Sequence, residues 1–158
     1  ESVFETTTWY LYNTNVSGIS PAGESLQTEN SSTTGWTPTT TVSTTAKYWY
    51  SPTLNGNYSA GNWSFVLWTN APSSASNISV SLYKVNSDGS EAFQIGTTQT
   101  LDVSSTGGGN HTSTFNFNNI SSASFNNQRL MVQIVKASGE DATMCYNTND
   151  FQTRLTTP

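Results

Sequence analysis

Residues that could perform acid–base or nucleophilic chemistry are few in this sequence. It contains one histidine, His111, and one cysteine, Cys145. A catalytic triad needs a histidine that is oriented by a carboxylate and lies beside a nucleophile. The Gly-x-Ser-x-Gly motif that would present a serine nucleophile does not occur. One histidine and one cysteine without a cluster of carboxylates do not make a zinc site either. We therefore expect no catalytic residue, no metal, no cofactor and no enzymatic activity.

The carboxylates offer little more chemistry. Glycoside hydrolysis needs two carboxyl groups across a cleft, and most of the ten acidic residues lie in predicted turns or at the termini. Asn86, Asp88, Ser90 and Glu91 are spaced faintly like the start of a calcium-binding loop, but the distal glutamate of such a loop is missing. The pair Asp88-Gly89 is typical of a hairpin turn, which is the interpretation we favour.

Asparagine is the residue that offers a site for modification. The N-glycosylation pattern Asn-x-Ser/Thr occurs at Asn15, Asn30, Asn57, Asn62, Asn77, Asn110 and Asn119. Because Ser, Thr and Asn make up 67 of the 158 residues, several such triplets arise by chance, and their positions are more informative than their number. Asn30, Asn57 and Asn110 fall in predicted loops and are the best candidates for covalent N-glycans. Asn62 is the weakest candidate, since bulky Trp63 follows it.

Charge and hydropathy exclude two classes of partner. Only 9% of the residues are charged and the net charge is −5, with five basic residues. Nucleic-acid binding needs a basic stripe that this composition cannot form. No apolar run reaches the roughly 20 residues of a membrane span. Surface glycans could supply the solubility that charges usually supply, so we expect an extracellular or cell-surface protein from which a signal peptide has been removed before Glu1.

Alternating apolar and polar residues predict strands throughout the chain, and no helical periodicity is sustained. The expected strands are 3–12, 46–51, 62–69, 77–86, 91–95, 97–103, 112–118, 127–137, 142–147 and 151–156. Residues 22–45 form the one long irregular segment, with Trp36 folded back onto the sheet or exposed as a stacking platform. Cys145 lies in an apolar stretch and is expected to be a buried thiol. This pattern favours an all-β fold, a β-sandwich of the jelly-roll or immunoglobulin-like type.

The first expected strand, residues 3–12, is unusual because it carries apolar side chains on both faces. Trp9 and Leu11 lie on one face, and Tyr10 and Tyr12 on the other. Such a segment needs cover on both sides. A terminal strand can complete its own sheet or an open edge in a neighbouring subunit, and the second arrangement, repeated head to tail, produces a filament.

With this strand, its glycosylation triplets, low charge and lack of disulfides, the chain resembles the thread-type pilus subunits of archaeal cell surfaces. The resemblance implies a donor strand at residues 1–13 and a single β-sandwich domain at 14–158, polymerised with other copies of itself for adhesion or biofilm formation. It implies contacts with the neighbouring subunit at Val3, Phe4, Trp9, Tyr10, Leu11 and Tyr12.

Two other classes remain open. A secreted carbohydrate-binding or adhesin module would present aromatic side chains to sugars. The candidates for that role are Trp36, Trp49, Tyr50, Trp63 and Trp68, although most of them are expected in the core. A virion or surface-layer coat domain would also be glycosylated and rich in aromatic residues.

Overall fold

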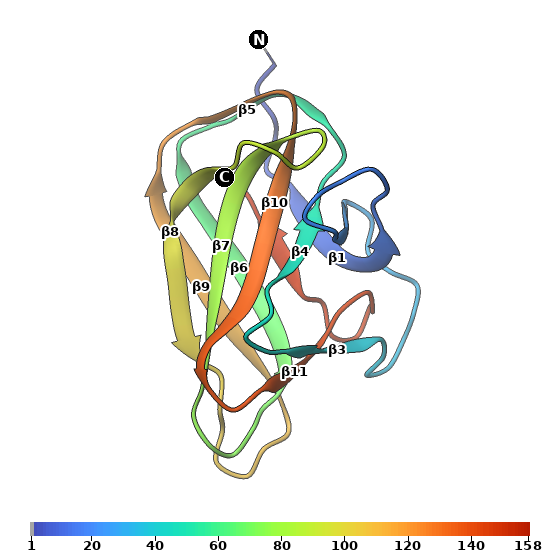
Figure 1. Cartoon of the computed structure of the whole chain (residues 1–158), viewed down its shortest axis with the longest axis vertical. Helices are drawn as coiled ribbons and strands as arrows, with labels where there is room; N and C mark the ends of the chain where they lie inside the picture. The colour runs from blue at the N-terminus through green and yellow to red at the C-terminus, as the bar shows by residue number, and fades with distance from the viewer. Residues whose placement is uncertain (1) are drawn as a thin grey trace.

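The computed structural model describes residues 2–158, which form an all-β fold (Figure 1). Within this range there is no helix, and hence none that is long and apolar enough to cross a membrane. The strands are β1 (Thr8–Asn15), β2 (Glu24–Gln27), β3 (Thr39–Val42), β4 (Lys47–Tyr50), β5 (Leu54–Tyr58), β6 (Gly61–Asn70), β7 (Ser76–Asn86), β8 (Phe93–Asp102), β9 (Asn110–Ile120), β10 (Ala123–Gly139), β11 (Ala142–Cys145) and β12 (Arg154–Thr156). The predicted all-β class is therefore confirmed.

Hydrogen bonds join these strands into one sheet that curls into an open half-barrel (Figure 1). Its order is β3-β11-β6-β12-β1-β2-β4-β10-β7-β8, with β9 added beside β6 and β5 beside β10. The pairings between named strands are antiparallel, apart from the parallel pair β2–β4. The N-terminal strand β1 therefore lies in the middle of the sheet order, where the half around β6 meets the half around β10.

The core lies on the inner face of the curl and follows the predicted alternation. Fully buried side chains come from the centres of three long strands: Trp63, Phe65 and Leu67 of β6; Ile78, Val80 and Leu82 of β7; and Leu130, Val132 and Ile134 of β10. Burying each such side chain contributes about 1.5–3 kcal/mol. Cys145 is fully buried as predicted, and burial raises the pKa of its thiol to about 11, which leaves it unreactive.

The first strand begins later than the sequence predicts. The expected strand 3–12 is replaced by β1, which starts at Thr8 and runs to Asn15, preceded by an isolated parallel bridge between Val3 and Asn57. The reason is a change of partner, because the chain leaves β5 after residue 4 and joins β12 at Thr8. The residues between these two partners belong to no ladder.

Three short strands escaped prediction. The expected irregular segment 22–45 contains β2 and β3, and β5 covers residues expected in a loop. Four or five residues are too few for a clear alternating pattern. In β5 the pair Asn55-Gly56 resembles a turn, yet it pairs with β10, with Gly56 at φ 141.

Two strands that the sequence predicted separately, 91–95 and 97–103, form the single strand β8. Gly96 at φ 71 forms an irregularity inside β8 that shifts its register against β7. A glycine within a strand often marks such a bulge. The predicted hairpin turn between β7 and β8 is present, closed by hydrogen bonds from Asn86 N to Ser90 O (2.9 Å) and from Gly89 N to Asn86 O (2.9 Å).

Candidate functional site

The candidate site is the slot that the N-terminal strand fills. β1 lies between β12 and β2, with Trp9 opposite Leu155 on one side and Leu11 opposite Leu26 on the other. Trp9 is 5% exposed and Leu11 is fully buried. The Trp9 Nε1 donates a hydrogen bond to the hydroxyl of Tyr58 (3.1 Å). The inner face of the strand is thus part of the core of its own chain.

The outer face of β1 is only partly covered. Tyr10 and Tyr12 are half-buried. The Tyr12 hydroxyl donates to the carbonyl of Glu29 (2.6 Å), and partial burial, together with the charge of Glu29, raises its pKa. Trp49 Nε1 donates to the Tyr12 carbonyl (3.2 Å). The sequence predicted that both apolar faces of this strand need cover. The face with Trp9 and Leu11 is fully covered, and the face with Tyr10 and Tyr12 is partly covered.

The residues before β1 cross to β5. Phe4 N donates to Asn57 O (2.7 Å), Asn57 N donates to Ser2 O (2.9 Å), and the Phe4 ring contacts Tyr58 with centroids 4.7 Å apart. Val3 is 62% exposed. Of the six residues expected at a subunit interface, two are therefore in the core of their own chain, three are half-buried and one is exposed.

The chain after β1 is fastened to the domain independently of β1. Val16 and Ile19 pack against a cluster around Tyr50 and Met131. The Tyr50 hydroxyl donates to Pro21 O (2.6 Å), and Ser20 N donates to Asp88 O (3.0 Å). Residues 13–15, between the buried part of β1 and this anchored loop, are exposed. The pairing of β1 with β2 is irregular between Leu11 and Asn15, and Asn15 is opposite Glu24.

A hollow of about 550 Å³ opens beside the slot. Its wall includes Trp9, Leu26 and Tyr50, with Glu29 and Arg129 at its polar side. Arg129 is held by hydrogen bonds to Ser51 O (2.9 Å) and Ser87 O (2.8 Å). Trp9 therefore borders this hollow as well as contributing to the core.

A second polar contact stabilises the same region. The hydroxyl of Tyr146 donates to Glu24 Oε1 of β2 (2.9 Å). Burial raises the pKa of the Glu24 carboxyl, although this hydrogen bond and the charge of Lys47 act in the opposite direction. The pKa of Tyr146 is raised as well, by burial and then by Glu24.

The seven glycosylation candidates differ in accessibility. Five are exposed: Asn15, Asn30, Asn62, Asn110 and Asn119. Asn77 is half-buried, and its Nδ2, the atom that would carry a glycan, donates to Ser138 Oγ (3.1 Å). Asn57 is half-buried within β5 rather than in a loop, and its Oδ1 is buried without a partner. Asn57 was ranked among the best candidates because it was predicted to lie in a loop. That prediction is wrong, since Asn57 lies in β5.

Of the five aromatic residues considered as sugar platforms, three are buried and two, Trp36 and Trp68, are half-buried. Trp49, Tyr50 and Trp63 are fully buried. Trp36 and Trp68 both pack edge-on against Phe151, with centroids 4.8 and 5.1 Å apart. Trp36 thus folds its loop back onto the sheet, one of the two interpretations that the sequence left open.

His111, which was considered for catalysis, and Asp88 and Ser90, which were considered for calcium binding, form hydrogen bonds within their own turns. His111 Nε2 contacts Gly108 O (2.8 Å), and both N and Oγ of Ser90 donate to Asp88 Oδ1 (3.0 and 2.6 Å). In the part of the chain that the structure describes, no three His, Cys, Asp or Glu residues are grouped as a metal site would require.

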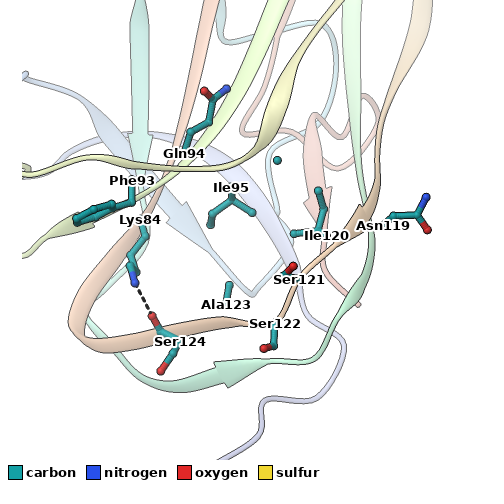
Figure 2. Close-up of a pocket in the computed structure, with 11 residues that line it drawn as sticks. Lys84, Phe93, Gln94, Ile95, Asn119, Ile120, Ser121, Ser122, Ala123 and Ser124 are labelled. Carbon is teal, nitrogen blue, oxygen red and sulfur yellow. Dashed lines mark hydrogen bonds between the residues drawn. The ribbon is translucent and has the colours of Figure 1, made fainter.

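Sequence reasoning missed one feature, a hollow between β8 and the β9–β10 connection (Figure 2). It is bordered by Phe93 and Lys84, which are paired across β7 and β8. The signal was present, since Lys84 ends the inward-facing series Ile78, Val80, Leu82. A charged residue at an inward position indicates that the interior opens to solvent there.

Comparisons with known proteins bear on the fold alone. No protein-family model and no curated protein sequence matches this chain. Its fold is similar to part of a CocE/NonD family hydrolase from Staphylococcus aureus (TM-score 0.70, 12% identity, 98% of this chain and 36% of that one). It is also similar to part of an aminopeptidase from a marine sediment Thaumarchaeota archaeon (TM-score 0.67, 10% identity, 98% and 37%). The chain spans about a third of the length of these structures.

Proposed function

We propose that this chain is a structural, non-enzymatic subunit of a glycosylated extracellular filament, in which the N-terminal strand of each copy enters the next. In this proposal the half-barrel is a jelly-roll or immunoglobulin-like sandwich formed by residues 14–158, and residues 1–13 are the strand that is exchanged. The observation that carries it is the position of β1: this strand, seated between β12 and β2, contributes Trp9 and Leu11 to the core.

Exchange costs little in contacts, because a second copy presents the same strand to the same slot. The Trp9–Tyr58 hydrogen bond and the ladders with β12 and β2 would all form again between subunits. The anchored loop after Val16 would keep its place in its own subunit, and residues 13–15 would extend as the hinge. Each subunit both gives and receives a strand, so the assembly grows head to tail.

A pair of cysteines tests this directly. Thr8 and Thr156 are opposite each other in the β1–β12 ladder and are half-buried, and residues so paired have Cα atoms within reach of a disulfide. We expect the double variant Thr8→Cys/Thr156→Cys, oxidised as a monomer, to form no filaments. If it assembles while reduced and is then oxidised, we expect a ladder of covalent multimers on a non-reducing gel.

Filaments that on oxidation yield only monomers with internal disulfides would show that β1 stays in its own chain, and the proposal would fail. A single Thr8→Cys variant is the matched control, since it cannot form the bridge. Deletion of residues 1–12 supplies a second test: electron micrographs should show no filaments, and a synthetic peptide of residues 1–13 should bind the truncated domain.

The glycan part of the proposal has its own measurement. We expect mass spectrometry of glycopeptides from the native source to find occupancy among Asn15, Asn30, Asn62, Asn110 and Asn119, and little at Asn57 and Asn77. Native protein without glycans at any exposed acceptor would remove the glycoprotein claim and leave strand exchange standing.

A further inference from the structure

The hollow beside Phe93 is where the inner face of the half-barrel is left uncovered. Phe93 and Ile95 are on the inward face of β8, and Lys84 is on the inward face of β7, opposite Phe93. Ile95 is 7% exposed, whereas Phe93 two residues earlier is 61% exposed. Gln94, between them, points away from the hollow (Figure 2). The core therefore ends at Ile95, and the next inward ring faces solvent.

The walls combine apolar and polar groups. Ile120 and Ala123 pack against the core from the β9–β10 connection and form the apolar side opposite Phe93 (Figure 2). Ser121, Ser122 and Ser124 of the β9–β10 connection supply hydroxyl groups around the rim. The hollow has a volume of about 390 Å³, within the range of small-ligand sites.

Among residues 2–158, Lys84 is the single charged residue that lines the hollow. Its Nζ lies 5.6 Å from the centroid of the Phe93 ring and donates a hydrogen bond to Ser124 O (3.1 Å; Figure 2). An ammonium group has three donors, and this contact uses one. A positive charge at the edge of an exposed ring, in a chain with net charge −5, favours a ligand that carries an anion beside an apolar face.

We propose that this hollow binds an acidic saccharide, with a uronic acid ring stacked on Phe93 and its carboxylate paired with Lys84. One face of a pyranose ring presents C–H groups that fit an aromatic face, and its hydroxyls suit the serine hydroxyl groups of the rim. A charge-assisted hydrogen bond from Lys84 would distinguish acidic from neutral sugars. The proposal depends on Phe93 and Lys84, not on strand exchange, so each can fail without the other.

The test uses the full-length monomer, an oligosaccharide of glucuronic acid and the matching oligosaccharide of glucose. We expect titration calorimetry and saturation-transfer NMR to detect the acidic probe and to show weaker binding of the neutral one. Phe93→Ala should weaken binding of the acidic probe about tenfold or more, while Phe93→Tyr should retain it. Lys84→Gln should bring the two probes close to equal affinity.

Leu101→Ala is the matched control, because Leu101 is also exposed on β8 but does not line the hollow. Circular dichroism of each variant checks the fold. Equal binding of both probes by the unaltered protein, or no binding of either, would overturn the proposal. So would a Phe93→Ala variant that binds the acidic probe normally but no longer forms filaments, since that outcome assigns the hollow to a contact between subunits.

Discussion

The slot of β1 and the hollow at Phe93 are two borders of the same core. The first is covered and the second is open to solvent. Trp9 and Phe93 are both aromatic residues near the start of a strand, yet Trp9 is 5% exposed and Phe93 is 61% exposed. Trp9 has a paired strand on each side, whereas β8 pairs with β7 alone among the described strands. The exposure of an aromatic ring here depends on whether another strand covers it, not on its own strand.

The two proposals give these borders different roles. In the proposed filament, the slot filled by β1 would serve assembly, because a second copy can repeat its contacts. An uncovered ring beside a lysine suits reversible binding of a small ligand. Each of the following predictions alters one border and uses the other as its reference.

The largest expected effect is at Trp9. Replacing it with alanine empties the centre of the slot and leaves the Tyr58 hydroxyl without its donor, so we expect Trp9→Ala to lower the free energy of unfolding by about 3–5 kcal/mol. Urea denaturation of the monomer measures this. Val3→Ala, at an exposed position of the same segment, should change stability by less than about 0.5 kcal/mol. A Trp9→Ala cost below about 1 kcal/mol would contradict a filled slot.

Gly56 tests how the start of the chain is held. A Cβ there would lie 2.8 Å from Ser2 O and 2.9 Å from the Phe4 ring, at a φ of 141. We expect Gly56→Ala to release residues 2–4 from β5 and to cost about 1–3 kcal/mol, seen as faster proteolysis of the N-terminus. Gly18→Ala is the control, since its φ is also positive and nothing lies within 4 Å. Equal rates of proteolysis for the two variants would show that the contact of Gly56 with residues 2–4 does not hold the N-terminus in place.

Glu24 in β2 gives a smaller effect that depends on pH. Its pKa is raised in the folded state because the carboxyl is partly buried. The folded chain therefore binds this proton more tightly than the unfolded chain, and its contribution to stability falls as pH rises above the ordinary value of 4.5. We expect the stability of the unaltered protein relative to Glu24→Gln to decrease between about pH 4 and pH 7.

Urea denaturation of both proteins across that range measures this change. The comparison is needed because Asp88 and Asp102 act in the opposite sense. Hydrogen bonds from Ser90 and Ser104 hold the pKa of these two carboxyls below the usual value. Their stabilisation is therefore lost as pH falls through the acidic range. A pH-independent difference between the unaltered protein and Glu24→Gln would contradict the prediction.

The smallest effect on stability is expected at Phe93. Because most of its ring is in solvent, Phe93→Ala should change the free energy of unfolding by less than about 0.5 kcal/mol. Its effect on unfolding, set beside that of Trp9→Ala, measures the contrast between the two borders. A loss of 2 kcal/mol or more would show that the ring contributes to the core and is not free to receive a ligand.

Much of the fold was accessible from local pattern. The alternation in 62–69, 77–86 and 127–137 predicted three long strands and their buried faces, and the buried thiol of Cys145 followed from its apolar surroundings. The short strands β2, β3 and β5 were not predicted, because four or five residues with few apolar side chains carry no period. The pair Asn55-Gly56 resembled a turn, and only its pairing with β10 makes it a strand.

By itself, the sequence determined which side chains alternate, how few groups could perform catalysis, and which asparagines carry an acceptor triplet. The tertiary structure decided that Trp9 lies between two flanking strands and points into the core, that Asn57 is inside a ladder, and that Phe93 and Lys84 border an open hollow. The physical reason is that a strand's alternation is a property of neighbouring residues along the chain. Which strand covers it is decided by hydrogen-bonded partners more than a hundred residues away, such as Leu155 opposite Trp9.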